Sequence, residues 1–379
     1  MRRLLPLLLL LLLPLLGHAN APAVETPRPK IGLVLSGGAA RGLAHIGVLK
    51  ALEEQGIKID AIAGTSMGAV IGGLYASGYK IDELEKLALG IDWQQALSDA
   101  PPRKDVPFRR KQDDRDFLVK QKLSFRDDGS LGLPLGVIQG QNLALLLESL
   151  LAHASDTRDF DKLPIPFRAV ATDIASGEKV VFRKGHLPKV IRASMSIPAV
   201  FAPVELDGRL LVDGGMTDNI PLDVAREMGV DVAIVVDIGT PLRNRKQLVT
   251  VVDVLNQSTT LMTRRNSEEQ LATLKKDDVL IQPALASFGS TDFGRAREMI
   301  DAGYRATRIL EARLAPLRPS EAPDAELMAA RTPSERTPVI TAIRVENDSK
   351  VGDDVIRYYI RQQIGEPLDL GRLQTDMGT

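Results

Sequence analysis

Cysteine is absent from this 379-residue chain, and histidine is scarce. The lack of cysteine excludes disulfides, thiolate metal sites, a cysteine nucleophile and a lipidated cysteine anchor. Excess charge is missing too, because 48 Lys and Arg against 49 Asp and Glu leave a net charge of -1. Without a basic stripe, a nucleic acid is not expected as a partner. The four histidines are His18, His45, His153 and His186, and because His18 is expected to leave with a signal peptide, the other three are the candidate bases.

A long apolar run occurs only at the start of the chain. Leu4–Leu16 follows two arginines and precedes several small residues, which is the order of a secretory signal peptide. The alternative is a membrane anchor, but the run is shorter than the ~20 apolar residues that cross a bilayer. We therefore expect residues 1–21 to be a cleaved signal and 22–29 to be a flexible, Ala- and Pro-rich lead-in.

Two short apolar runs each end in a tight turn and hand over to a helical pattern. Ile31–Leu35 is followed by a helix over residues 43–55. Asp60–Ala63 is followed by a helix over residues 66–77. Strand–turn–helix repeated in this way predicts a parallel sheet with helices on its faces. The expected fold class is α/β, a three-layer α/β/α sandwich with a mainly parallel central sheet.

Further along, the patterns predict buried strands, hairpins and long helices. Asp207–Gly208 between two apolar runs is a strong two-residue hairpin signal. A proline-rich stretch over residues 315–338 is typical of a linker, which leaves residues 30–314 as one domain. The expected strands are Phe167–Asp173, Lys179–Phe182, Val204–Leu206, Leu210–Val212 and Val232–Asp237, and the expected helices are Asn142–Leu151, Thr250–Leu274 and Asp292–Leu314.

The strongest chemical signal is the segment Gly64–Thr65–Ser66–Met67–Gly68. It lies where a predicted strand meets a predicted helix, which is the context that a Gly-x-Ser-x-Gly nucleophile elbow requires. Gly64 and Gly68 allow the sharp turn and keep other atoms away from the hydroxyl. The helix N-terminus favours an anion at this point. The pattern predicts Ser66 as a nucleophile, and the alternative is a Gly-Ser turn without chemistry.

A second glycine-rich loop, Gly37–Gly42, also joins a strand to a helix. Backbone N–H groups at Gly37 and Gly38 are predicted to stabilise an oxyanion, which is worth about 3 kcal/mol per donor in acyl transfer. Arg41 is expected to add charge there or to brace the loop. The rival interpretation is a phosphate-binding loop, but the P-loop and dinucleotide-binding spacings are both missing.

A serine nucleophile needs a base. None of the histidines has a recognisable triad context, and a structural role is the simpler interpretation for each. Asp213 precedes two glycines and follows a predicted strand. A carboxylate is a weak base in water, but burial raises its pKa and makes proton uptake from Ser66 feasible. The alternative for Asp213 is an ordinary turn aspartate.

Taken in order, the two glycine loops and the Asp213–Gly215 turn resemble those of the patatin-like phospholipases, over about residues 30–314. Three other stretches agree, namely Arg192–Pro198, Phe201–Pro203 and Asn219–Pro221. The resemblance implies a Ser66–Asp213 dyad, with Gly37, Gly38 and Arg41 at the oxyanion hole. It implies no cofactor and no metal for the chemistry.

Residues 339–379 resemble the start of a POTRA module, with a strand over Val339–Glu346 and a helix over Asp353–Ile364. A signal peptide, a patatin domain and a POTRA start together resemble the single-chain type V (type Vd) secreted patatins of Gram-negative bacteria. In those proteins a POTRA module and an outer-membrane barrel follow, so we expect the chain to be a fragment. The resemblance implies a secreted or outer-membrane-surface location.

The expected function is that of a secreted phospholipase A-type acyl hydrolase. Its expected partners are a phospholipid substrate and a membrane surface. A homodimer is also compatible with the sequence. One alternative is a general carboxylesterase or peptidase that uses the same elbow. Another is a non-catalytic passenger module that docks on membranes. Asn142–Leu151 and Phe288–Phe293 are candidates for an acyl groove.

Overall fold

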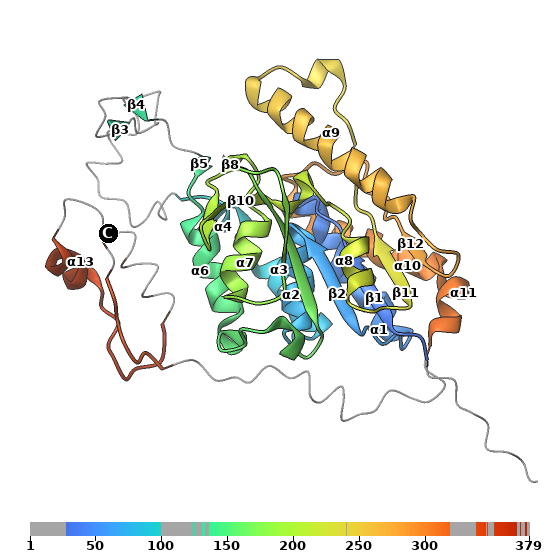
Figure 1. Cartoon of the computed structure of the whole chain (residues 1–379), viewed down its shortest axis with the longest axis horizontal. Helices are drawn as coiled ribbons and strands as arrows, with labels where there is room; N and C mark the ends of the chain where they lie inside the picture. Colours follow the sequence, from blue (N-terminus) through green and yellow to red (C-terminus); the bar gives the residue numbers. More distant parts are fainter. Residues whose placement is uncertain are drawn as a thin grey trace, which may run out of the picture.

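The computed structural model describes residues 28–99, 124–125, 131–132, 136–239, 241–318, 339–345, 347, 352–369, 372 and 376. These residues form an eight-stranded sheet with helices on both faces (Figure 1). The order is β12-β11-β1-β2-β6-β10-β9, and β7 also pairs with β6. The strands are β1 (Ile31–Leu35), β2 (Ala61–Thr65), β6 (Phe167–Asp173), β7 (Lys179–Phe182), β9 (Val204–Leu206), β10 (Arg209–Asp213), β11 (Val232–Val236) and β12 (Val279–Ile281).

Five neighbouring strands of this sheet, from β12 to β6, run parallel. In the middle, Leu33 of β1 lies opposite Ile234 of β11 on one side and Ile62 of β2 on the other. The strands β7, β10 and β9 are antiparallel to their partners. The mainly parallel sheet and both predicted strand pairs, β6–β7 and β9–β10, are therefore confirmed. Small two-stranded pairings join β3 (Ser124–Phe125) to β4 (Leu131–Gly132) and β5 (Gly136–Ile138) to β8 (Ala199–Phe201).

The helices agree in place with the predicted ones, except at the end of the domain. The predicted helix over Asp292–Leu314 is divided into three parts. This segment begins with a 3₁₀ turn, continues as α10 and is interrupted at Leu310 before α11. The helices are α1 (Ala44–Glu54), α2 (Met67–Ala76), α3 (Ile81–Gly90), α4 (Trp93–Ala96), α6 (Gln141–Leu150), α7 (Leu187–Ser194), α8 (Leu222–Glu227), α9 (Val251–Leu271), α10 (Ala296–Ile309) and α11 (Glu311–Leu314).

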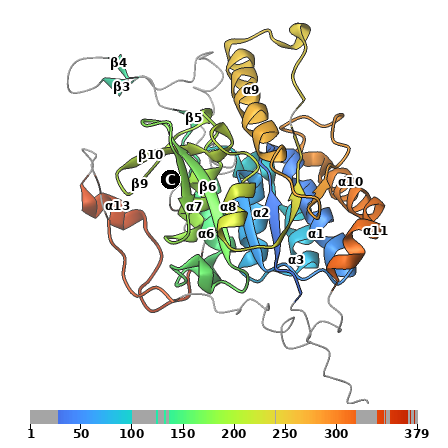
Figure 2. The same ribbon diagram turned by 45° about the vertical axis from the view of Figure 1, so that its right-hand side comes forward.

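Side chains of the strands alternate between two apolar cores, one on each face of the sheet. Leu33 and Leu35 of β1 belong to the larger core, which α1, α2, α3, α6, α7 and α10 cover. Val34 belongs to a smaller core, where α8 and the C-terminal end of α9 pack. Figures 1 and 2 show α8 and α9 on the opposite face from α1 and α2. The three-layer α/β/α arrangement is thus the one predicted.

The position of α1 is fixed by a close crossing with α10. A Cβ atom added to Gly47 would lie 1.8 Å from the carbonyl oxygen of Ile300, and one added to Gly303 would lie 2.0 Å from that of Ala44. Only glycine permits this backbone-to-backbone contact. Because α1 continues directly from the Gly37–Gly42 loop, the crossing also holds that loop in place.

The C-terminal segment differs from its prediction. Val339 forms a single bridge with Pro367, and residues 340–345 form no strand. The helix α13 (Asp353–Tyr359) ends five residues before the predicted Ile364. Ile360 is already extended, and the chain then turns back through Gly365, whose N–H donates to the carbonyl of Ile340. The predicted strand over Val339–Glu346 is therefore wrong within the described residues.

Other expectations fall at or beyond the limits of the described residues. The predicted signal peptide, residues 1–21, lies outside them. Of the predicted linker, residues 315–318 are described, and Leu317 among them is buried in the domain core; residues 319–338 lie outside the described residues. Every helix in the described ranges is too short or too polar to span a lipid bilayer.

Candidate active site

Ser66 sits on a sharp turn between β2 and α2, as the elbow pattern predicts. Its backbone is strained, with φ 54° and ψ -123°, in a region that residues with a side chain rarely adopt. The turn needs its glycines. A Cβ atom at Gly64 would lie 2.6 Å from the carbonyl oxygen of Gly68, and one at Gly68 would lie 2.2 Å from that of Leu35. The surrounding packed backbone keeps Ser66 in this strained conformation, which places its hydroxyl at the N-terminus of α2.

Asp213 reaches Ser66 through the register of the sheet. Thr65 of β2 lies opposite Val170 of β6, and Asp213 of β10 lies opposite the next residue, Ala171. The ends of β2 and β10 therefore meet across β6, although their residues are far apart in sequence. The Ser66 hydroxyl donates to Asp213 Oδ2 over 2.6 Å. The other carboxylate oxygen accepts the N–H of Gly215 over 2.8 Å, which fixes the orientation of the carboxylate.

Burial makes Asp213 a better base than a free aspartate. Loss of hydration raises the pKa of its carboxyl from 3.8 to about 6, against the opposing hydrogen bonds from Ser66 and Gly215. A base with a pKa near the working pH can take a proton and still be ionised beforehand. The carboxylate of Asp213 has both the contact and the basicity that proton abstraction from Ser66 requires.

The glycine loop differs from the expected picture at Gly37. Its N–H donates to the backbone oxygen and to the side-chain Oδ1 of Asn219, over 3.3 and 3.2 Å. In the described part of the chain, the N–H groups of Gly38 and Ala39 have no protein acceptor. Gly37 therefore connects the loop to Asn219, and the next two N–H groups are the ones available to an oxyanion.

Arg41 is almost fully buried and lines the same cavity as Ser66. Desolvation lowers the pKa of its guanidinium to about 10, although the charge of Asp237 works in the opposite direction. The group stays cationic at neutral pH, so it adds positive charge close to the loop.

The histidines take structural roles in the described residues. His45 is fully buried, its Nε2 lies 2.8 Å from the carbonyl oxygen of Ser36, and burial lowers its pKa to about 4. His153 contacts the carbonyl of Ser77 over 3.1 Å, and His186 lies 3.4 Å from Glu148. None of these three rings lines the cavity at Ser66. The fourth, His18, lies outside the described residues.

Sequence reasoning gave no role to Ser194, which supports the elbow directly. Its hydroxyl accepts the N–H of Ser66 over 2.9 Å and donates to the carbonyl of Val170 over 2.6 Å. Asn219, which holds Gly37, was likewise unassigned. Both belong to stretches that carry the family resemblance, Arg192–Pro198 and Asn219–Pro221, so the signal was present without its explanation.

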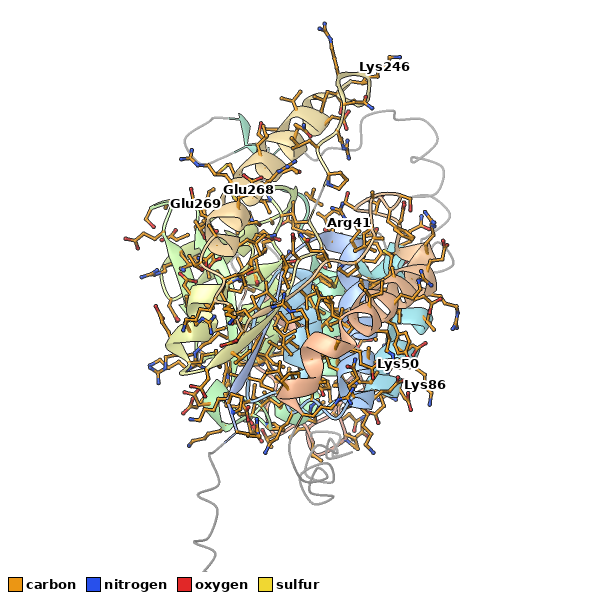
Figure 3. The ribbon with its side chains drawn as sticks, turned by 90° about the vertical axis from the view of Figure 1, so that its right-hand side faces the viewer. Arg41, Lys50, Lys86, Lys246, Glu268 and Glu269 are labelled. Carbon is orange, nitrogen blue, oxygen red and sulfur yellow. The ribbon has the colours of Figure 1, made fainter. Side chains whose placement is uncertain are left out.

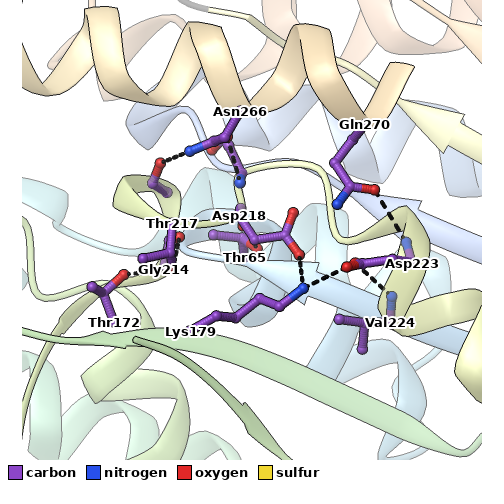
Figure 4. A network of polar contacts seen from close by, with 12 residues as sticks. Thr65, Thr172, Lys179, Gly214, Thr217, Asp218, Asp223, Val224, Asn266 and Gln270 are labelled. Atoms are coloured by element: carbon purple, nitrogen blue, oxygen red, sulfur yellow. Dashed lines mark hydrogen bonds and ion pairs between the residues drawn. The ribbon is translucent and has the colours of Figure 1, made fainter. Parts of the chain in front are cut away.

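Next to the site, a charged cluster anchors the loop that follows Asp213 (Figure 4). Lys179 Nζ lies 3.0 Å from Asp218 Oδ2 and 2.6 Å from Asp223 Oδ2. The carboxyl group of Asp218 is almost fully buried, and this burial raises its pKa to about 7 despite the lysine. The backbone oxygen of Asp218 accepts the hydroxyl of Thr65, the neighbour of Ser66. The cluster thus ties β2, β7 and the Asp213 loop together.

Removing the lysine is expected to destabilise the fold in a pH-dependent way. Lys179→Met leaves the buried carboxylate of Asp218 without its cation, which typically costs about 3 kcal/mol. The loss of unfolding free energy is expected to be largest above pH 7, where Asp218 is ionised. It is expected to shrink below pH 7, where the group is protonated. Urea unfolding at pH 5.5 and 8.5 measures this, and Lys179→Met/Asp218→Asn is expected to recover most of the loss. An equal loss at both pH values would contradict the explanation.

The cavity at Ser66 has a volume of about 830 Å³. Its walls combine the polar groups described above with apolar side chains. The apolar lining includes Leu97, Ile138, Met195, Ile197, Val200, Phe201, Phe288 and Phe293. Phe288 and Phe293, the ends of one segment considered for an acyl groove, therefore both line this cavity. The helix α6 instead lines a separate and much smaller pocket. Among the described residues, no group of His, Cys, Asp or Glu side chains is arranged to hold a metal ion.

Comparison with known proteins identifies the family of the chain. A model described as patatin-like phospholipase matches residues 33–226. The chain is 35% identical over 210 residues to an uncharacterized NTE family protein of Mycobacterium tuberculosis, a match over 55% of this chain and 49% of that protein. It therefore spans about half the length of this relative.

Matches extend further in two other proteins. Identity is 32% over 302 residues with patatin-like phospholipase domain-containing protein 7 of Rattus norvegicus, covering 73% of this chain and 20% of that protein. Among solved structures, VipD from Legionella pneumophila aligns with a TM-score of 0.43 and 19% identity, over 76% of this chain and 67% of that one.

Proposed function

The chain belongs to the patatin-like phospholipase family, and from this premise we propose that it hydrolyses carboxylic esters of phospholipids through Ser66 and Asp213, as a phospholipase of the A type. Membership implies a lipid hydrolase. The observation that carries the proposed mechanism is the 2.6 Å hydrogen bond from the Ser66 hydroxyl to a buried carboxylate whose pKa is raised to about 6.

In the first step Asp213 takes the proton of the Ser66 hydroxyl while the oxygen attacks the ester carbonyl carbon. The carbonyl oxygen becomes an oxyanion, for which the N–H groups of Gly38 and Ala39 and the charge of Arg41 are available. When the tetrahedral intermediate collapses, the bond to the lipid alcohol breaks. The alcohol oxygen takes the proton from Asp213 and leaves, and the acyl group stays on Ser66.

In the second step a water molecule replaces the alcohol. Asp213 takes one of its protons as the water oxygen attacks the acyl carbon. The ester bond to Ser66 breaks, the serine oxygen takes the proton back, and the fatty acid is released. A cavity of about 830 Å³ beside Ser66, lined in part by apolar side chains, supports a long acyl chain as the substrate.

Export is a second part of the proposal. We propose that residues 1–21 direct the chain across the inner membrane of a Gram-negative bacterium, to a secreted or outer-membrane-surface location. Support comes from the arginines and the apolar run Leu4–Leu16. The relation to type Vd secreted patatins rests on the sequence resemblance of residues 339–379 alone, and so does the expected barrel.

The proposed function is tested with a fluorophosphonate probe and with phospholipid vesicles. The purified chain is expected to form a covalent adduct on Ser66, located by peptide mass spectrometry, and to release fatty acid from the vesicles. A folded protein that forms no adduct and releases no fatty acid would be a binding module instead. Turnover of a short soluble ester without any release from phospholipid would favour the carboxylesterase alternative.

A further inference from the structure

The helix α9 carries four of its apolar side chains on the outside. Val254, Leu255, Leu261 and Met262 are each about half exposed. Val254 and Leu261 are seven residues apart, as are Leu255 and Met262, so the four form one stripe along a single face of the helix. We name these four residues the outer stripe. A helix on the surface of a globular protein normally presents the opposite pattern.

The inner face of α9 is polar and belongs to the active site. Three threonines of this face, Thr259, Thr260 and Thr263, line the cavity. One turn further, Asn266 donates to the carbonyl of Gly215 over 2.9 Å and accepts the N–H of Asn219 over 3.0 Å. These contacts account for the polar residues, but they leave the outer stripe without a partner in the described residues. Four exposed apolar side chains that share one face of a helix indicate a binding surface.

The outer stripe belongs to a segment whose other residues line the cavity. Pro241, Leu242 and Arg243, just before α9, also line that cavity. In Figures 1 and 2 the N-terminal part of α9 stands out from the body of the molecule. Figure 3 shows Lys246 at the outer end of this projection, whereas Glu268 and Glu269 lie nearer the body. A flat surface that met the stripe would therefore lie against the same projection whose other residues line the cavity.

The outer end of the projection is cationic, in contrast to the whole chain with its net charge of -1. Residues 241–265 contain one acidic residue, Asp253, which pairs with Arg243. Arg245 and Lys246 are exposed and have no acidic partner in the described part of the chain. Further along α9, Arg264 and Arg265 pair with Glu268 and Glu269, so Arg245 and Lys246 carry the charge of this segment that no ion pair among the described residues compensates.

From this combination we infer that the outer stripe, with Arg245 and Lys246, docks the protein on an anionic phospholipid surface and brings lipid to the cavity mouth. This inference rests on the proposed function, because it identifies the surface from which the active site would take its lipid substrate. Apolar side chains flanked by cations are the pattern of interfacial membrane helices. A second copy of the chain fits less well, because two identical stripes face to face would bring like charges together.

Vesicle binding by the full chain tests the inference. All proteins carry Ser66→Ala, so that the vesicles are not digested and binding is measured apart from turnover. The parent is expected to co-sediment with vesicles of phosphatidylglycerol and phosphatidylcholine more strongly than with phosphatidylcholine alone. Leu255→Ser/Met262→Ser removes two apolar side chains from the outer stripe and is expected to weaken partitioning at least about tenfold. The matched control Ile174→Ser/Ile309→Ser changes two exposed apolar residues elsewhere and is expected to bind as the parent does.

Charge is tested in the same way. Arg245→Glu/Lys246→Glu is expected to abolish the preference for phosphatidylglycerol, since each basic residue near such a surface contributes about 1 kcal/mol, or about fivefold in binding. The control Lys86→Glu/Lys184→Glu makes the same charge change on other elements. In the Ser66-containing protein, the stripe and charge variants are expected to hydrolyse a short soluble ester at the parent rate.

The outcomes separate docking from catalysis. Parent-like vesicle binding by the stripe variant, or no vesicle binding by the parent, would overturn the inference. So would a parent dimer that the stripe variant converts to a monomer with vesicle binding unchanged, because a second copy would then be the occupant. Normal vesicle binding together with an inactive Ser66-containing protein would instead remove the proposed function and leave the docking surface standing.

Discussion

Ser66→Ala is expected to lower kcat for ester hydrolysis by about 10⁵-fold, the size of effect typical of removing a serine nucleophile. The change deletes the atom that is to form the acyl-enzyme and leaves the strained backbone as it is. Fluorophosphonate labelling is expected to disappear with the activity. Circular dichroism and urea unfolding are expected to show an intact fold, since the one hydrogen bond lost is that to Asp213.

A glycine at the same position serves as the matched variant. Ser66→Gly removes the hydroxyl as well, but it also relieves a φ of 54° that is unfavourable for a residue with a Cβ atom. We expect it to be as inactive as Ser66→Ala and to be more stable than Ser66→Ala by about 1 kcal/mol. Ester turnover near the parent rate in both variants would remove Ser66 from the mechanism and return attention to another nucleophile.

Asp213→Asn is expected to lower kcat by about 10³-fold, because the amide cannot accept the proton from Ser66. The parent's kcat/KM is expected to rise with pH up to the pKa of Asp213 at about 6 and then to level off. The variant is expected to lose this inflection along with most of its activity. A parent-like rate, or an unchanged inflection in the variant, would point to a different base.

Stability provides a second and independent measurement on Asp213. Because burial raises its pKa from 3.8 to about 6, the folded protein binds more protons than the unfolded chain between these pH values. The contribution of this group to the free energy of unfolding therefore falls as pH rises through that window, by about 3 kcal/mol in total. Asp213→Asn removes this titration. The free energy of unfolding of the variant minus that of the parent is therefore expected to be larger at pH 7.5 than at pH 4. The same stability difference at both pH values would show that Asp213 has an ordinary pKa.

Much of the fold could be predicted because its signals are local. An apolar run that ends at glycines, as at Ile31–Leu35, specifies a buried strand and a turn without reference to the rest of the chain. Asp207–Gly208 specifies its hairpin in the same way. The C-terminal prediction failed for the complementary reason. The alternation over Val339–Glu346 is compatible with a strand, but a strand needs a partner, and in the structure only Val339 meets one.

The candidate site was predictable in its parts and not in its connections. Ser66 and Asp213 could be singled out from the turns that hold them. Gly37 was expected to offer its N–H to a substrate, but that N–H donates to Asn219, a residue 182 positions away. No local pattern announces such a partner. The same holds for Lys179 of β7, whose acidic neighbours come from the loop after Asp213 and from α8.

By itself, therefore, the sequence determined which residues are chemically able to act. The signals were glycines at sharp turns and the periodic spacing of apolar residues in the strands and helices. Tertiary structure decided which of them meet. Residues 147 positions apart share one hydrogen bond because β2 and β10 are both in register with β6. It also decided that α9 turns its threonines inward and its leucines outward, since the inner face of that helix is needed by the loop after Asp213 and by the cavity.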